Sequence, residues 1–203
     1  MAIVINGSGT VTGITAGGLP DGIITADDLA STGTFPAWSG ANLTDVGGGK
    51  ILQVVQSTFS TQTSYTPSSN GVYTDTGLNV SITPSSTSSK ILLMFNVSLG
   101  SNYNNRRIHL RINGGNATDY QGGGTQARAS AITIEPRAGD DYRQLQGVLT
   151  YVDSPATTSS TTYTLQVSNE GGGGYHVYLN RASTIDDYTG ECKSTAIAME
   201  IGA

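Results

Sequence analysis

From Lys50 onward the sequence alternates apolar and polar residues over short stretches that end in turns rich in Gly, Ser, Thr and Pro. Leu78, Val80 and Ile82, for example, alternate with Asn79 and Ser81. An alternation of period two is typical of a β-strand with one buried and one exposed face. No segment of helical length repeats its apolar residues with the period of a helix. The pattern therefore predicts an all-β domain.

About nine strands are predicted in this part of the chain. They cover residues 50–56, 78–82, 91–99, 108–112, 129–134, 144–152, 163–168, 175–180 and 196–201. Because no helical segment separates them, antiparallel hairpins and crossings must connect the strands. The simplest arrangement is two packed sheets, an antiparallel β-sandwich of the jelly-roll kind. About 150 residues can bury near 70% of their unfolded surface, so this part is expected to fold alone.

Residues 1–49 have a different composition. They contain no Lys or Arg and carry −4 of the net charge of −5, together with 11 of the 27 glycines. Their apolar residues Ile3, Ile5, Val11 and Ile14 stand in a Gly/Ser/Thr-rich string that cannot cover them. We therefore predict an extended anchoring segment over 1–49, which packs against a partner or other copies, and a display domain over 50–203. The alternative is a disordered tail.

Composition argues against several classes of partner. With 12% charged residues and a pI near 4.8, the chain lacks the clustered Lys and Arg that a nucleic acid requires. No apolar run approaches the roughly 18 residues of a membrane span, so membrane insertion is not expected. The first residues lack the basic and apolar regions of a signal peptide. The single Cys192 fits a protein made in a reducing cytoplasm.

The sequence offers no convincing catalytic or metal-binding pattern. It has no Gly-x-Ser-x-Gly motif, and Cys192 has no evident His partner. Both histidines are assigned to polar strand faces, and hence to the surface. The pairs Asp140-Asp141 and Asp186-Asp187 could bind calcium or act as glycosidase carboxylates, but adjacent acids point to opposite faces of an extended chain. We expect no enzyme activity, no cofactor and no metal.

Aromatic, amide and charged residues gather near predicted turns. Such groups on the loops of a rigid sandwich suit sugar hydroxyls or the rim of a protein interface. The alternatives are ordinary polar loops or contacts between subunits. The candidate recognition residues are Tyr103, Asn104, Asn105, Arg106, Tyr120, Arg137, Asp140, Asp141, Tyr142 and Tyr188.

Several longer segments carry a resemblance to known proteins. Near the start these are Ile5-Asn-Gly-Ser-Gly-Thr-Val-Thr-Gly-Ile and Gly18-Leu-Pro-Asp-Gly-Ile-Ile-Thr-Ala-Asp-Asp-Leu. Later come Gly49-Lys-Ile-Leu-Gln-Val-Val-Gln, Tyr73-Thr-Asp-Thr-Gly-Leu and Ser81-Ile-Thr-Pro-Ser-Ser-Thr-Ser-Ser-Lys-Ile-Leu. The last are Tyr178-Leu-Asn-Arg181 and Ala198-Met-Glu-Ile-Gly202. The first group resembles the N-terminal segments, and the others the repeated C-terminal module, of tail-fibre-like proteins of marine and cyanobacterial double-stranded DNA phages.

The resemblance implies a β-sandwich carried on the virion surface, generally trimeric, fixed by its N-terminus and displayed by its C-terminus. It implies no catalytic residues. The expected partners are two further copies of the chain, other phage virion proteins at the N-terminus, and a host surface glycan or protein. Assembly would occur in the cytoplasm of the bacterial host, and the site on the tail, collar or head stays open. The alternatives are a head or collar decoration protein with a purely structural role and, as an outsider, a polysaccharide depolymerase.

Overall fold

The computed structural model describes residues 50–68, 71–102, 107–116, 132–135, 142–171, 174–187 and 189–202. The predicted anchoring segment, with Ile3, Ile5, Val11 and Ile14, lies outside the described residues. The contact pattern separates residues 48–203 from the preceding segment as a compact unit. All statements on the fold therefore concern this unit.

The described residues form ten strands and no helix. They are β1 (Ile51–Phe59), β2 (Thr63–Tyr65), β3 (Thr74–Ile82), β4 (Lys90–Ser101), β5 (Ile108–Asn113), β6 (Ile132–Ile134), β7 (Leu145–Asp153), β8 (Thr161–Asn169), β9 (Val177–Leu179) and β10 (Ser194–Ile201). Every pairing between them is antiparallel. The prediction of an all-β antiparallel fold is confirmed. The short strand β2 was not predicted, because three residues are too few to show an alternation.

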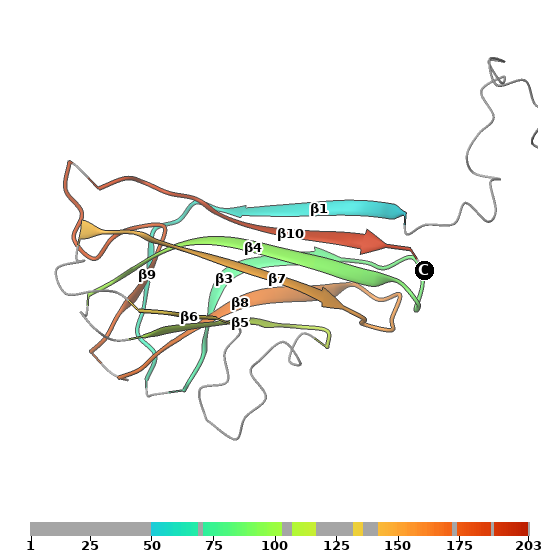
Figure 1. The fold of residues 1–203 in the computed structure, drawn as a ribbon, viewed down its shortest axis with the longest axis horizontal. Coiled ribbons are helices and arrows are strands. Elements are labelled where there is room, and N and C mark those ends of the chain that lie inside the picture. Colours follow the sequence, from blue (N-terminus) through green and yellow to red (C-terminus); the bar gives the residue numbers. More distant parts are fainter. Residues whose placement is uncertain are drawn as a thin grey trace, which may run out of the picture. The chain divides into compact units, whose positions relative to one another are not determined.

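The strands form two sheets (Figure 1). Sheet A has the order β1-β10-β4-β9-β2, with β7 also paired to β4, and sheet B has the order β3-β8-β5-β6. Leu99 of β4 pairs with both Leu179 of β9 and Leu145 of β7, so these two strands lie on opposite edges of β4. Leu92 pairs in the same way with Met199 of β10 and with Val152 of β7. Strands β10 and β9 therefore follow one another along a single edge of β4.

Strands β1 and β2 continue one another in the same way, because they pair with β10 and β9 respectively. Sheet A is thus a four-stranded sheet in which two of the strands are interrupted once. If β1 and β2 are counted as one strand, and β9 and β10 as another, the described part of the domain has eight strands. Numbered along the chain, these strands follow the order 1-8-3-6 in sheet A and 2-7-4-5 in sheet B. This is the strand order of a jelly roll, as predicted.

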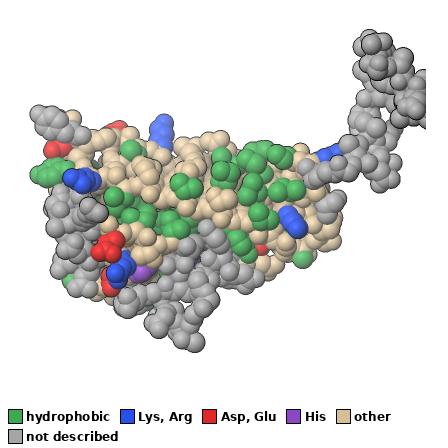
Figure 2. All heavy atoms as spheres, in the orientation of Figure 1, with side chains coloured by type: hydrophobic (Ala, Val, Ile, Leu, Met, Phe, Trp, Pro, Cys, Tyr) green, Lys and Arg blue, Asp and Glu red, His purple; other side chains and the backbone are tan. Residues whose placement is uncertain are grey.

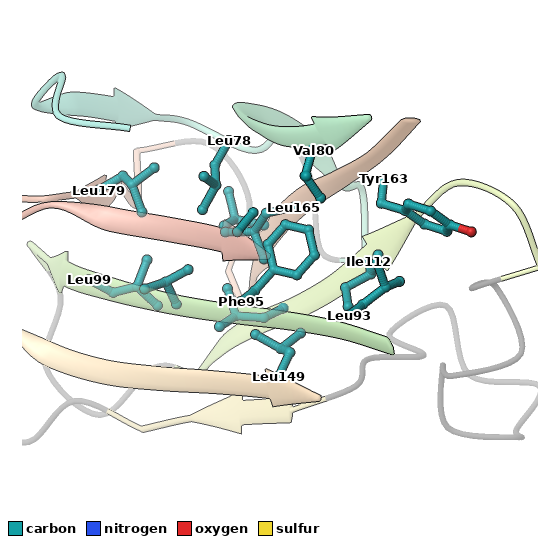
Figure 3. Close-up of a cluster of buried hydrophobic side chains, with 14 of the residues drawn as sticks. Leu78, Val80, Leu93, Phe95, Leu99, Ile112, Leu149, Tyr163, Leu165 and Leu179 are labelled. Atoms are coloured by element: carbon teal, nitrogen blue, oxygen red, sulfur yellow. The ribbon is translucent and has the colours of Figure 1, made fainter. Parts of the chain in front are cut away.

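The core lies between the two sheets and is formed by the inward residues of each alternating strand (Figure 3). Sheet A contributes Leu93, Phe95 and Leu149, whereas sheet B contributes Leu165 and Tyr163. All five are fully buried. Removing Phe95 or a similar side chain from such a core costs about 3–5 kcal/mol, so the apolar alternation read from the sequence also accounts for the stability of the sandwich.

A buried carboxylate closes one end of the sandwich. Glu200, on the inner side of β10, accepts hydrogen bonds from the Ser85 backbone N–H at 2.7 Å and from the Ser85 hydroxyl at 2.6 Å. The Ser89 hydroxyl donates at 2.7 Å and the Gln53 amide at 2.6 Å. Burial by itself raises the pKa of Glu200, but these hydrogen bonds outweigh it and lower the pKa to about 2. The carboxylate therefore joins β1, the β3–β4 connection and β10.

Both ends of the described domain lie at this same end of the sandwich. The Gly202 N–H donates to the Lys50 carbonyl at 2.8 Å, so the entry and exit of the domain are neighbours (Figure 1). The ends of β2 and β4 lie at the opposite end, because these strands run antiparallel to β9, which begins there. We call the two the entry end and the distal end.

Candidate recognition site

Most of the recognition residues proposed from the sequence lie outside the described residues. These are Tyr103, Asn104, Asn105, Arg106, Tyr120, Arg137, Asp140, Asp141 and Tyr188. Tyr142 is described and exposes 58% of its surface. Asn102 and Arg107, which border the first of these segments, follow β4 and precede β5 at the distal end. The role of these residues stays a prediction.

The placement of His109 on the surface was wrong. It lies on β5 with only 5% of its surface exposed. Its Nδ1 is 3.1 Å from the Thr133 hydroxyl of the neighbouring strand β6. A polar partner on an adjacent strand allows a polar side chain to be buried, and alternation alone cannot reveal such a partner. His176, in contrast, is half-buried and hydrogen-bonded, in agreement with its prediction.

The two rings of His176 and Tyr178 and the planar guanidinium of Arg181 form a row on the outer side of sheet A at the distal end. Tyr178 of β9 points outward, since its neighbours Val177 and Leu179 are buried in the core. The rings of His176 and Tyr178 have centroids 6.0 Å apart and planes inclined by 29°. The guanidinium carbon of Arg181 lies 4.6 Å from the centroid of the Tyr178 ring, within cation–π range. All three side chains are half-buried.

Hydrogen bonds hold this row in place. The His176 ring Nδ1 is 2.7 Å from the Thr66 hydroxyl, and the His176 backbone N–H donates to the Asn102 side chain at 2.7 Å. Arg181 donates from Nε to the Ala182 carbonyl at 3.0 Å and from Nη2 to the Ser183 carbonyl at 2.8 Å. These contacts preorganise the aromatic and cationic groups, which lowers the entropic cost of binding a ligand.

Asn180 fixes the backbone between Tyr178 and Arg181. Its amide donates to the Phe59 carbonyl at 2.7 Å and to the Thr61 carbonyl at 3.1 Å, and its side-chain oxygen accepts from Ser194 at 2.6 Å. Its φ of 63° lies in the left-handed region, which asparagine tolerates better than most residues. One buried side chain therefore links the interruption between β1 and β2 to the interruption between β9 and β10.

Gly100 of β4 permits the chain after Asn180 to pack closely on sheet A. A Cβ at Gly100 would lie 2.5 Å from the Arg181 carbonyl oxygen and 2.9 Å from the Ala182 Cα. Any side chain there would displace the backbone that carries Arg181.

The row suits binding better than catalysis. Aromatic faces next to a guanidinium and hydroxyl groups can stack on a sugar ring and bond to its hydroxyls. Cys192 is a half-buried free thiol. Within the described ranges no group of three His, Cys, Asp or Glu side chains could hold a metal ion, and no helix could cross a membrane.

Comparisons with known proteins leave the family open. No protein-family model matches the chain, and no curated protein does. Among solved structures, the chain is similar to VP2 of the infectious bursal disease virus subviral particle, with 13% identity and a TM-score of 0.29. The match covers 73% of this chain and 39% of VP2, so the chain spans less than half of that protein. The jelly-roll assignment rests on the strand order and not on this similarity.

Only part of this site could be predicted from the sequence. The alternation over Tyr175–Asn180 predicts that His176 and Tyr178 share one side of a strand, and they do. It also placed Asn180 on that side, yet Asn180 is buried. Arg181 follows the strand, and its side chain lies over the Tyr178 ring because the backbone turns at Asn180 with a left-handed φ. An alternation of apolar and polar residues cannot predict such a turn.

Proposed function

We propose that this chain is a non-enzymatic structural protein of a bacteriophage virion, a short fibre-type subunit anchored by its N-terminal segment. The observation that carries the proposal is that the point of attachment and the candidate recognition site lie at opposite ends of the domain. Lys50 and Gly202 lie at the entry end, whereas the row of His176, Tyr178 and Arg181 lies at the distal end. A domain attached at one end and carrying a preorganised polar and aromatic surface at the other suits display. The resemblance to phage tail-fibre modules supports the same proposal.

Within this function we propose that the distal end binds a glycan of the host surface. The His176 and Tyr178 rings supply aromatic surface, and the guanidinium of Arg181, held over the Tyr178 ring, supplies a positive charge beside it. Ligand-binding groups of a jelly roll commonly lie on its loops, which a rigid scaffold positions.

The first test concerns attachment. A fragment of residues 50–203 is expected to remain folded and β-rich by circular dichroism, since its core and both sheets lie within it. It should fail to join virions in cells that produce a virus deleted for the full chain. Ile3→Asp with Ile5→Asp in the full chain should also prevent incorporation, because burying unpaired carboxylates costs several kcal/mol. Particles that carry the fragment at normal levels would place the anchor on the sandwich.

The second test concerns adhesion. Binding of the full chain to surface polysaccharide purified from the host, measured by biolayer interferometry, should weaken roughly tenfold or more in Tyr178→Ala. Asn79→Ala, an exposed change on sheet B, should bind as the original chain does. The polysaccharide should keep its length during the incubation. Equal binding by Tyr178→Ala would exclude this row, and shortening of the polymer would overturn the non-enzymatic assignment.

A head or collar decoration protein is the second candidate. It is favoured by the exposed hydrophobic side chains of sheet A, among them Val54, Val148 and Val152. Such a surface could bind a shell protein and stabilise the particle. Immunogold labelling of virions against residues 50–203 would separate the two candidates, because a fibre is labelled at the tail and a decoration protein over the head or collar.

A further inference from the structure

Arg181, at the distal end, has no acidic partner among the described residues. In that part of the chain both ion pairs belong to Arg107, which contacts Glu135 at 3.2 Å and Glu170 at 3.3 Å. The neighbours of the Arg181 guanidinium are a tyrosine ring and two backbone carbonyls, which carry no net charge. A full positive charge is therefore held in a half-buried position with no carboxylate to balance it.

Part of the Arg181 guanidinium is open to a ligand. A guanidinium has five N–H bonds. One on Nε and one on Nη2 donate to carbonyls, so both N–H bonds of Nη1 and one of Nη2 make no hydrogen bond within the described residues. Nη1 is not among the buried atoms that lack a partner, so it is in contact with solvent. Nη1 and Nη2 form a planar fork, which matches the two oxygens of a carboxylate.

His176 offers a second polar contact beside the same ring. Its Nδ1 is 2.7 Å from the Thr66 hydroxyl, whereas its Nε2 makes no hydrogen bond with the described residues and is likewise open to solvent. A sugar hydroxyl can bond to Nε2 in either tautomer, because a hydroxyl group both donates and accepts. The His176 ring and the Arg181 guanidinium each lie within 6.0 Å of the centre of the Tyr178 ring, so one short saccharide can contact both.

The described strands of sheet A carry no exposed acidic side chain that would repel an anion. They contain two carboxylates, Asp153 and Glu200, and both are fully buried. Both residues pair with Ile91 near the start of β4, so they lie toward the entry end. Figure 2 shows mainly hydrophobic and uncharged side chains over β1, β10, β4 and β7, with charged side chains mostly toward the two ends of the domain. An anion that approaches Arg181 along this sheet therefore meets no acidic side chain of its strands.

Given the proposed glycan binding at the distal end, on which this step rests, we propose that the ligand is an acidic sugar of the host surface. Its carboxylate binds the Arg181 fork, and a neighbouring hydroxyl bonds to His176. A carboxylate carries one negative charge, equal to the one permanent positive charge of the row, whereas a phosphate monoester carries nearly two. Hydrogen bonds from Arg181 to its own loop hold the guanidinium before binding, so little side-chain freedom is lost.

The test compares binding of the full chain to host surface polysaccharide before and after the carboxyl groups of the polymer are reduced to alcohols with carbodiimide and borohydride. The reduced polymer keeps its sugar rings and loses its carboxylates, so binding measured by biolayer interferometry should weaken roughly tenfold or more. The same polymer treated with alkaline phosphatase, which removes phosphate monoesters, should bind as the untreated polymer does.

Two substitutions of Arg181 separate its charge from its geometry. Arg181→Gln removes the charge and should weaken binding to the untreated polymer roughly tenfold or more. Arg181→Lys keeps the charge but loses the planar fork, so its affinity should lie between those of Arg181→Gln and the original chain. The matched control is Lys90→Gln, which removes the same charge from an exposed residue toward the entry end and should bind as the original chain does. Circular dichroism checks that each variant is folded.

Equal binding of the untreated and the carboxyl-reduced polymer would overturn the acidic ligand and leave glycan binding intact, and so would equal binding by Arg181→Gln and the original chain. Binding that is lost after phosphatase treatment would overturn it in favour of a phosphate. Absence of binding to the untreated polymer would overturn the proposed glycan binding and the acidic ligand with it. If Arg181→Gln does not fold, the comparison of the two polymers decides, because it uses the original chain alone.

Discussion

Replacing Asn180 with alanine should lower the free energy of unfolding by about 3–4 kcal/mol. The change removes both donors that satisfy the Phe59 and Thr61 carbonyls and the acceptor of the buried Ser194 hydroxyl. The buried Ser194 hydroxyl, left without its acceptor, costs about 1–3 kcal/mol, and each of the partly buried hydrogen bonds to the Phe59 and Thr61 carbonyls contributes about 0.5–1.5 kcal/mol. Alanine also tolerates the left-handed φ of 63° less well than asparagine.

Urea unfolding followed by far-UV circular dichroism measures this effect, with all variants at one protein concentration because association would add to the apparent stability. Asn180→Gly should recover part of the loss, roughly 1 kcal/mol, since glycine relieves the backbone strain without restoring any hydrogen bond. The matched control is Asn79→Ala, whose exposed amide donates only to the Gly77 carbonyl two residues away, and it should stay within about 0.5 kcal/mol. A loss below about 1 kcal/mol in Asn180→Ala would show that water or local rearrangement satisfies the freed carbonyls.

The fold was largely predictable because a sandwich repeats one simple rule. Leu78, Val80 and Ile82 are all buried, and Asn79 and Ser81 are exposed, as alternation requires. The interruptions of sheet A were not predictable. Strand β2 spans three residues, and the segment between β1 and β2 is held by the amide of Asn180, more than a hundred residues away in sequence. A hydrogen bond between residues so far apart produces no periodic pattern of apolar and polar residues from which it could be predicted.

The segments that carried the family resemblance meet in the folded protein. Gln53, Ser85, Ser89 and Glu200 come from three of those segments and converge on one carboxylate. The role of these residues could not be predicted from the sequence, because a Ser-rich turn and a single Glu show no pattern that reveals whether they lie close together in the fold. The convergence gives a physical reason for their joint presence, namely that a buried carboxylate requires all of its donors at once.

Glu200 should make the stability of the domain sensitive to acid. Its pKa of about 2 in the folded protein lies below the ordinary value of 4.5. A carboxylate with a lowered pKa stabilises the fold above its unfolded pKa, and this contribution disappears as the pH falls toward the folded pKa. The stabilisation from Glu200 is therefore complete above about pH 5 and is lost between about pH 4.5 and pH 2.

The measurement is the urea midpoint of the original chain and of Glu200→Gln, each from pH 7 to pH 2. At pH 7 Glu200→Gln should be less stable by about 2–3 kcal/mol, since a neutral amide accepts weaker hydrogen bonds and its NH₂ group faces the donors of Ser85, Ser89 and Gln53. The difference between the two proteins should shrink as the pH falls, because the original chain then loses the charge that the variant lacks. Glu191→Gln, an exposed change just before β10, serves as the control and should follow the original chain throughout. A stability difference that stays constant from pH 7 to pH 2 would contradict the assignment, because it would show that the Glu200 carboxyl does not titrate across this range in the way its hydrogen bonds require.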